Sequence, residues 1–269
     1  MRFTSYPVPV VRGLLALSTA LSVQAYAARP MITDDARIVD AKACQVESWV
    51  KDNKNSTEYW AIPACNFTGN LEVSIGGSAI NQNGQTQNQS YVLQGKTLFK
   101  TLEKNGWGIG LAVGNAMQPR SDTQRHLLSS PYAYIPASFS FRDDHFVLHT
   151  NVGWLHDKPN NRNRATWGLG SETQLSERTW LIAETFDQSA GRPFYQLGVR
   201  HWLVPDHVQI DTTYGNRFGS GSEERWISIG LRLFNTGPNT EPHLQTPPVP
   251  APGSPEEREK KRLDDLYRG

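Results

Sequence analysis

Apolar and polar residues alternate along most of the chain between residues 44 and 234. In the run from Arg225 to Phe234, every second position is aliphatic, at Ile227, Ile229, Leu231 and Leu233. A period of two is typical of a β-strand with one apolar and one polar face. Similar segments predict twelve strands, over residues 44–50, 59–66, 71–79, 91–99, 107–114, 132–141, 146–154, 165–175, 179–187, 193–202, 208–214 and 226–234.

An even number of antiparallel strands is what bacterial outer-membrane barrels contain. The predicted connections support this fold because their lengths alternate. Those after odd-numbered strands have 8, 11, 17, 10, 5 and 11 residues, and those after even-numbered strands have 4, 7, 4, 3 and 5. Outer-membrane barrels alternate long outer loops with short periplasmic turns. We therefore expect an all-β protein, a single 12-stranded antiparallel transmembrane barrel over 44–234 with both ends in the periplasm. The Asn- and Gln-rich stretch 81–90 is expected to be a mobile outer loop.

Tryptophan positions support the same interpretation. All eight tryptophans lie within two residues of a predicted strand end. Indole rings prefer the membrane–water interface, so the sequence predicts one girdle at each rim. The outer girdle would contain Trp49, Trp60, Trp154, Trp167 and Trp226, and the inner one Trp107, Trp180 and Trp202.

The segments that flank the predicted barrel have other characters. Residues 1–27 read as a secretion signal, with basic residues before a short apolar core and cleavage between Ala27 and Ala28. Residues 28–43 show no strand period and are expected to form a periplasmic lead-in. There Asp34 and Asp35 favour a solvated turn over a Ca²⁺ site. Residues 235–269 are Pro-rich and then charged, which predicts a periplasmic tail. Its 254–267 segment is either disordered or a helix for a periplasmic partner.

Composition and charge exclude several classes. The chain has 27 basic and 26 acidic residues, so no basic domain for nucleic acid is present. Removal of residues 1–27 changes the formal charge from +1 to −1. A mean hydropathy of −0.53 is too polar for a helical membrane protein. It suits a barrel, in which every second strand residue faces a wet interior.

The two cysteines are predicted to form a disulfide. If Val50 pairs with Tyr59 across the first hairpin, Cys44 falls directly opposite Cys65. Opposed residues lie about 4.5–5.5 Å apart at Cα, within the range that a disulfide accepts. The periplasm is oxidising. No His is adjacent to either cysteine, so a metal site there is the weaker reading.

Charged residues at inward positions are the candidate functional residues. Four lie on successive predicted strands, namely Glu184, Arg200, Asp211 and Arg232, and Glu47, Glu72, Lys96 and Glu172 extend the set. A charged side chain facing lipid costs a few kcal/mol near the midplane, so all should point inward. They form either a constriction that selects solutes by charge or a self-neutralising network that braces the barrel. The sequence leaves both readings open.

Enzyme and metal sites are not predicted. Outer-membrane phospholipases use a Ser activated by a His, and His149 lies on a predicted strand without the His-x-Ser spacing of that family. Seven scattered His and no HExxH or paired-Cys motif give no zinc site. We expect no catalytic residue, metal or cofactor.

The stretch from Arg29 to Trp49, with Thr33–Ala36 as its clearest part, is followed by Gly-rich strands and a closing GLRLF. In these features the chain resembles the "MetA-pathway of phenol degradation" family of outer-membrane barrels. The resemblance implies uptake of small hydrophobic or aromatic molecules and carries over no functional residue.

The sequence therefore favours a narrow passive channel in the outer membrane, in contact with lipid outside and small solutes inside. The alternatives are a non-conducting structural barrel whose tail binds a partner, a barrel lipid hydrolase, and a soluble periplasmic β-protein.

Overall fold

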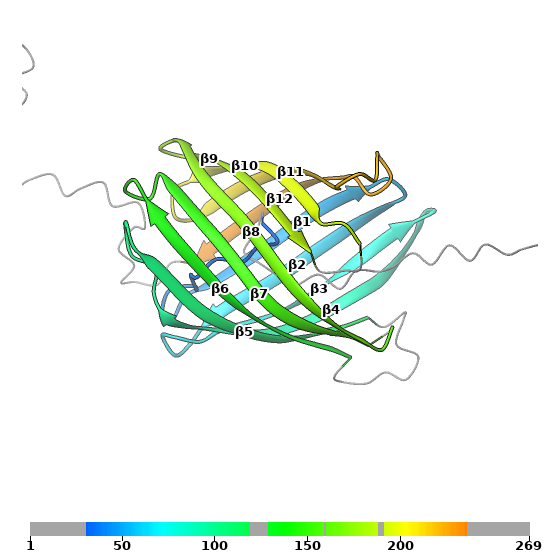
Figure 1. Cartoon of the computed structure of the whole chain (residues 1–269), viewed down its shortest axis with the longest axis horizontal. Helices are drawn as coiled ribbons and strands as arrows, with labels where there is room; N and C mark the ends of the chain where they lie inside the picture. The colour runs from blue at the N-terminus through cyan, green and yellow to red at the C-terminus, as the bar shows by residue number, and fades with distance from the viewer. Residues whose placement is uncertain (1–30, 119–128, 159, 188–190, 236–269) are drawn as a thin grey trace, which may run out of the picture.

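The computed structural model describes residues 31–118, 129–158, 160–187 and 191–235. Within them, twelve antiparallel strands close into one barrel, in which each strand pairs with its neighbours in the sequence and β1 pairs with β12 (Figure 1). The strands are β1 (Cys44–Asn53), β2 (Ser56–Asn66), β3 (Glu72–Gln82), β4 (Gln85–Lys100), β5 (Trp107–Met117), β6 (Ser130–Phe141), β7 (Phe146–Asp157), β8 (Arg162–Ser176), β9 (Thr179–Asp187), β10 (Phe194–Val204), β11 (Val208–Arg217) and β12 (Trp226–Asn235). The predicted fold class is confirmed.

Several strands extend further than predicted at the rim away from the chain ends. The Asn- and Gln-rich stretch 81–90, expected to be a mobile loop, is mostly strand. Only Asn83 and Gly84 separate β3 from β4, and both have positive φ, 55° and 77°. Asn-Gly favours the two-residue hairpin turn whose twist matches the flanking strands. The loop expectation for this stretch is therefore wrong.

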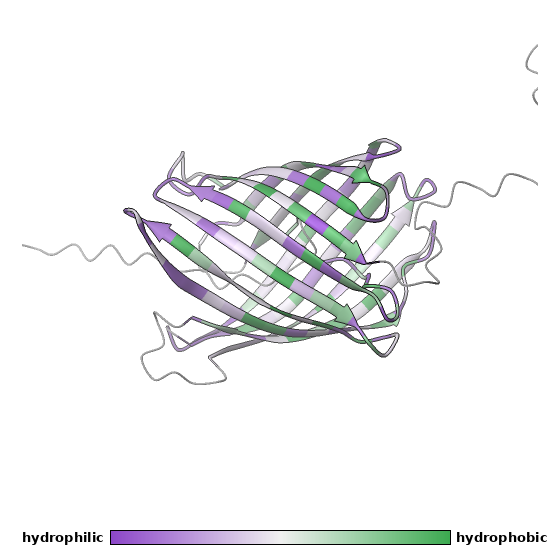
Figure 2. Cartoon of the chain, turned by 180° about the vertical axis from the view of Figure 1, so that it is seen from behind, coloured by the Kyte–Doolittle hydropathy of each residue, from purple (hydrophilic) through white to green (hydrophobic). Residues whose placement is uncertain are grey.

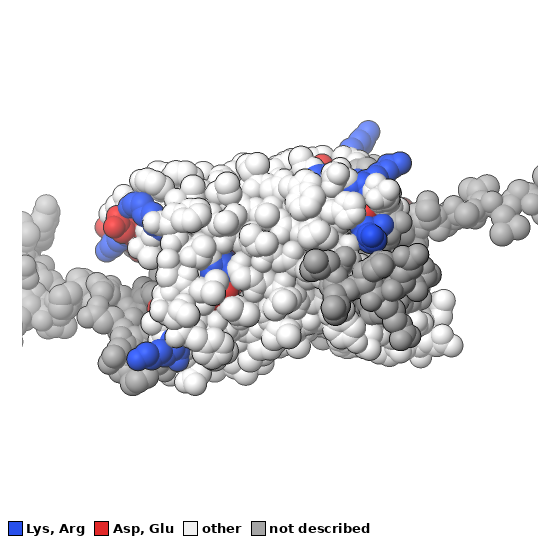
Figure 3. Space-filling model, turned by 90° about the horizontal axis from the view of Figure 1, so that it is seen from below, with Lys and Arg blue, Asp and Glu red and all other residues white. Residues whose placement is uncertain are grey.

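The wall has an apolar outer face and a largely polar inner face. Hydrophobic and hydrophilic residues alternate along the strands (Figure 2). The outward positions expose large aliphatic side chains, among them Ile75, Val113, Val152, Leu197 and Ile229. On the face that Figure 3 shows, charged side chains gather towards the two ends, and most of the wall between them carries none. An apolar belt around a closed barrel is the surface that lipid covers. The described residues contain no helix long and apolar enough to cross a membrane.

The tryptophans depart from the prediction of two interfacial girdles. Trp107, Trp154 and Trp167 point outward, with 46%, 44% and 39% of their surface exposed. The other five have the parity of buried, inward positions, at Trp49, Trp60, Trp180, Trp202 and Trp226. The position of a residue along its strand predicts its depth in the membrane. Whether its side chain faces lipid or the lumen depends on its odd or even place in the strand. The girdle assignment is therefore wrong for these five.

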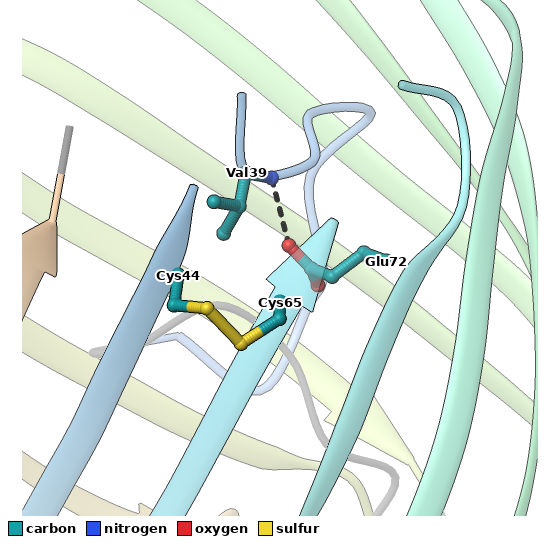
Figure 4. Close-up of a disulfide and its surroundings, with 4 residues drawn as sticks. All are labelled: Val39, Cys44, Cys65 and Glu72. Atoms are coloured by element: carbon teal, nitrogen blue, oxygen red, sulfur yellow. Dashed lines mark hydrogen bonds between the residues drawn. A yellow bond between two sulfur atoms is a disulfide. The ribbon is translucent and has the colours of Figure 1, made fainter. Parts of the chain in front are cut away.

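The predicted disulfide is present. Cys44 and Cys65 are register partners on β1 and β2, with Val50 opposite Tyr59 as expected, and their Cα atoms lie 4.1 Å apart (Figure 4). Both cysteines have outward parity. The bridge thus ties the first hairpin together from outside the barrel.

The N-terminal residues 31–43 lie inside the barrel, which corrects the expectation of a periplasmic lead-in outside it. Met31, Thr33, Asp34, Asp35 and Ala36 are all buried, and the segment contacts inward residues of several strands (Figure 1, blue). We call residues 31–43 the luminal segment. The predicted signal (1–27), residues 28–30 and the tail from residue 236 lie outside the described residues.

Candidate functional site

The lumen of the barrel, with the luminal segment in it, is the candidate site. Glycines on the inner face of β8 make room for the segment. A Cβ at Gly168 would lie 2.5 Å from Thr33 Oγ1, and one at Gly170 would lie 3.3 Å from the end of the Met31 side chain. At its start, Met31 packs against Trp180 and Ile182.

Wall carboxylates hold the backbone of the segment. Glu184, on β9, accepts hydrogen bonds from the amides of Ile32 and Thr33 at 2.8 and 2.7 Å. Across the lumen, Glu72 accepts one from the amide of Val39 at 2.8 Å (Figure 4). Hydrogen bonds to an ionised acceptor are about twice as strong as neutral ones. Two residues predicted to line the lumen therefore hold this segment.

The two aspartates of the segment meet a single lysine of the wall. Lys96 Nζ, on β4, lies 2.8 Å from Asp34 Oδ1 and 3.4 Å from Asp35 Oδ1. The hydroxyl of Tyr134, on β6, donates to Asp34 Oδ2 at 2.7 Å. Both aspartates are buried, so the expectation of a solvated turn is wrong.

Asp34 and Asp35 are not part of a membrane-spanning strand, and their surroundings shift their pKa values in opposite directions. Burial raises the pKa of Asp34, which Lys96 only partly offsets. Burial acts the same way on Asp35, but Lys96 and Arg37 outweigh it and hold the pKa of Asp35 below its usual range. Asp35 thus remains charged, as a partner for both cations.

The other predicted luminal residues also lie on the inner face. Arg200 pairs with Glu172 at 2.5 Å, across the intervening strand β9, and Arg232 pairs with Glu47 at 3.0 Å. Asp211 is buried and is the register partner of Arg200 on β11. The structure thus brings the predicted residues into several ion pairs and segment contacts. Their role in selecting solutes stays a prediction.

A Ser–His–Glu arrangement, which sequence reasoning missed, forms from side chains of the three neighbouring strands β6, β7 and β8 rather than from a short sequence motif. Ser138 Oγ lies 2.8 Å from His149 Nδ1, and His149 Nε2 lies 3.7 Å from Glu172 Oε1. Strand register alone would have placed Ser138 opposite His149. Both residues are fully buried beneath the luminal segment, whose Ala36 amide donates to Ser138 Oγ. The arrangement anchors the segment and lies on the face away from lipid. Within the described ranges, no three His, Cys, Asp or Glu side chains converge as a metal site would require.

The closed strand order, the apolar outer face and the polar lumen define an outer-membrane β-barrel. The chain belongs to the family described as "Uncharacterised conserved protein UCP029691", whose model matches residues 14–234. The family shown is thus not the phenol-degradation family that the N-terminal motif resembles. No curated protein matches the sequence.

Solved structures with the same fold include outer-membrane porins and a channel. The KdgM porin has 7% sequence identity and a TM-score of 0.52, over 70% of this chain and 98% of that one. The NanC porin has 9% identity and a TM-score of 0.52, over 71% and 98%. The COG4313 outer membrane channel from Pseudomonas putida F1 has 8% identity and a TM-score of 0.50, over 75% and 98%. At these identities the likeness shows the fold.

Proposed function

We propose that this protein is a narrow passive channel for small solutes, closed in this structure by its luminal segment. The observation that carries the proposal is the kind of contact that holds the segment. Residues 31–43 are not a strand of the wall, and their central contacts are polar or charged, to Glu184, Glu72 and Lys96. The names of the structural neighbours, two porins and a channel, agree with this function.

Polar contacts matter here because water can replace them. A hydrogen bond contributes only about 0.5–1.5 kcal/mol net, since the separated groups bind water instead. An apolar core has no such replacement. The inner residues that the segment covers carry carboxylate, ammonium and hydroxyl groups, at Glu72, Glu184, Lys96, Tyr134 and Ser138. A lumen vacated by the segment would be a hydrated, charged path.

Aromatic side chains on the inner face, in the half of the barrel away from the chain ends, support the proposal that the solutes are small aromatic or hydrophobic molecules. Trp49 and Trp60 stack there with ring centroids 5.2 Å apart. Phe194 lies 5.5 Å from Phe186 and 5.8 Å from Trp226. Aromatic faces bind other rings with a geometry and energy beyond their area alone. These side chains have inward parity and lie in the half of the lumen towards the rim away from the chain ends.

Planar-bilayer recording of the purified full chain tests the proposal. We expect rare, short openings, because the segment closes the lumen most of the time. Arg200→Ala, which removes the partner of Glu172, should change the ion selectivity of those openings. A complete absence of conductance, both in the parent and in variants that release the segment, would overturn the channel.

The alternative is a barrel that does not conduct. The burial of most inner side chains, including Gln196, Arg200 and Asp211, is the observation that favours it. Its proposed partner segment, 254–267, lies outside the described residues. A lipid hydrolase would need Ser138, so loss of a measurable esterase activity in Ser138→Ala would favour that reading instead.

A further inference from the structure

We propose that the place taken by the Asp34 side chain is a binding site for the carboxylate of a small monocarboxylate solute. Asp34 occupies this site while the lumen is closed, and a solute competes for it. The inference rests on the proposed channel, whose solute class it narrows.

Residues on two strands of the wall each contact one of the two oxygens of the same carboxylate. Lys96 supplies an ammonium 2.8 Å from Asp34 Oδ1, and Tyr134 supplies a hydroxyl 2.7 Å from Oδ2. Both wall residues are buried. Next to them, Gln94 Oε1 accepts a hydrogen bond from Tyr132 at 2.9 Å and lies 3.2 Å from the Tyr134 hydroxyl. A cation and a donor that face separate oxygens recognise a carboxylate by shape as well as by charge.

When the luminal segment leaves, Lys96 loses both of its aspartate partners. Removing one partner of a buried ion pair leaves an uncompensated charge, which is strongly unfavourable. Its register partner, Glu72, supplies one negative charge on β3, and the aspartates now supply the rest. A solute carboxylate entering the vacated lumen would replace Asp34 oxygen for oxygen.

The surrounding charges favour a single negative charge on the solute. Glu72 and Glu184 both face the luminal segment, and once it leaves they face the solute. Like charges that lie close together repel, and they do so more strongly beside a low-dielectric wall than in bulk water. A second or third anionic group would therefore meet these carboxylates, whereas one carboxylate on an uncharged body would not.

Because the solute competes with Asp34 for the same site, binding of the solute favours the open lumen. A ligand shifts a two-state equilibrium only through its different affinity for the two states, and this ligand binds only when Asp34 is displaced. At ten times its dissociation constant it should raise the population of the open state about tenfold. A solute of the right chemistry would thus open its own path.

The test measures release of the segment with a thiol. Thr33→Cys is nearly isosteric at a buried position whose Oγ1 has no hydrogen-bond partner among the described residues. The two natural cysteines are joined in the disulfide, so the new thiol is the one that reacts. The full-length variant in detergent is labelled with a maleimide in sodium propionate, in sodium chloride at equal ionic strength, and in neutral propionamide.

We expect propionate to accelerate labelling with saturation, up to about tenfold or more, and chloride and propionamide to have no such effect. In the Tyr134→Phe background Asp34 loses the same hydrogen bond, so labelling without propionate should be roughly tenfold faster, and the acceleration that propionate adds should be roughly tenfold smaller. Tyr214→Phe is the matched control, because it removes the same hydroxyl at an exposed, outward position of β11, and it should leave both rates unchanged.

Equal labelling rates in propionate, chloride and propionamide would overturn the site. So would an acceleration by propionate that Tyr134→Phe leaves untouched. Conductance without a propionate effect would reject this site and keep the channel. A saturable propionate effect without any conductance would keep the site and reject the channel.

Discussion

Lys96 and Asp34 form a buried ion pair across the lumen, with 2.8 Å between Nζ and Oδ1 and side-chain exposures of 4% and 3%. The two residues are 62 positions apart in the chain. One is part of the wall and the other of the luminal segment, so the pair holds the segment to the wall. Breaking a buried pair by removing one partner costs about 3–5 kcal/mol. Loss of either partner should therefore destabilise the closed lumen.

Neutralising the two aspartates should open the channel. In Asp34→Asn/Asp35→Asn, Lys96 loses both charged partners in the segment, and the closed state should lose about 3–5 kcal/mol. We expect the open time in planar bilayers to rise by at least a hundredfold. Asp52→Asn makes the same chemical change at an exposed, outward position of β1 and should behave like the parent. If the double variant has the same open time as the parent, these aspartates do not hold the lumen closed.

Filling the space at Gly168 should expel the segment and spare the wall. A Cβ there would lie 2.5 Å from Thr33 Oγ1, so Gly168→Leu leaves no room for residue 33. Trypsin should then cleave after Arg37, which lies in the luminal segment and should be protected in the parent. Gly95→Leu adds the same side chain on the outer face, where the nearest atom to a new Cβ is a Leu71 methyl at 3.7 Å. If Arg37 is protected from trypsin as completely in Gly168→Leu as in Gly95→Leu, Thr33 does not lie against Gly168 in the closed barrel.

Weakening the Glu184 contact should loosen only the start of the segment. Glu184→Gln keeps an acceptor for the amides of Ile32 and Thr33 but removes its charge. A hydrogen bond to a charged group is worth about 1 kcal/mol more than a neutral one. Hydrogen exchange at these two amides should therefore be about five times faster. Glu223→Gln, at an exposed carboxylate that pairs with Lys54, should leave their exchange rates unchanged.

Strand parity was enough to predict the wall. Alternation in Ile227–Leu233 placed Arg232 inside, and the first hairpin register placed Cys44 opposite Cys65. Phe234 has the inward parity of Arg232 and packs against Trp202, with ring centroids 5.4 Å apart. These features depend on contacts between neighbouring strands, which a period of two encodes locally.

Strand parity could not predict the position of the luminal segment. Its contacts join residues up to 152 positions apart, and its own sequence has no strand or helix period. A polar stretch with two aspartates looks the same whether it is bound by water or by a lysine in a lumen. The available signal was indirect: the register partners of Glu184 on its two neighbouring strands, Gly170 and Gln196, carry no charge. Inward glycines such as Gly168 gave a second hint that something fills the space.

The disulfide should stabilise the barrel without controlling the segment. Cys44 follows directly on the luminal segment, and nearby backbone bonds from Lys42 to Asn66 and from Asn66 to Ala43 join the same strands. Closing a loop with a sequence separation of 21 contributes about 3 kcal/mol. Under a reductant, the temperature at which the folded band disappears from heat-modifiable gels should fall. Trypsin should still spare Arg37, because the contacts to Glu184 and Lys96 are unaffected. Cys44→Ser/Cys65→Ser should melt like the reduced parent and be insensitive to reductant. If reduction instead exposed Arg37 below that temperature, the bridge would be one of the contacts that hold the segment in the lumen.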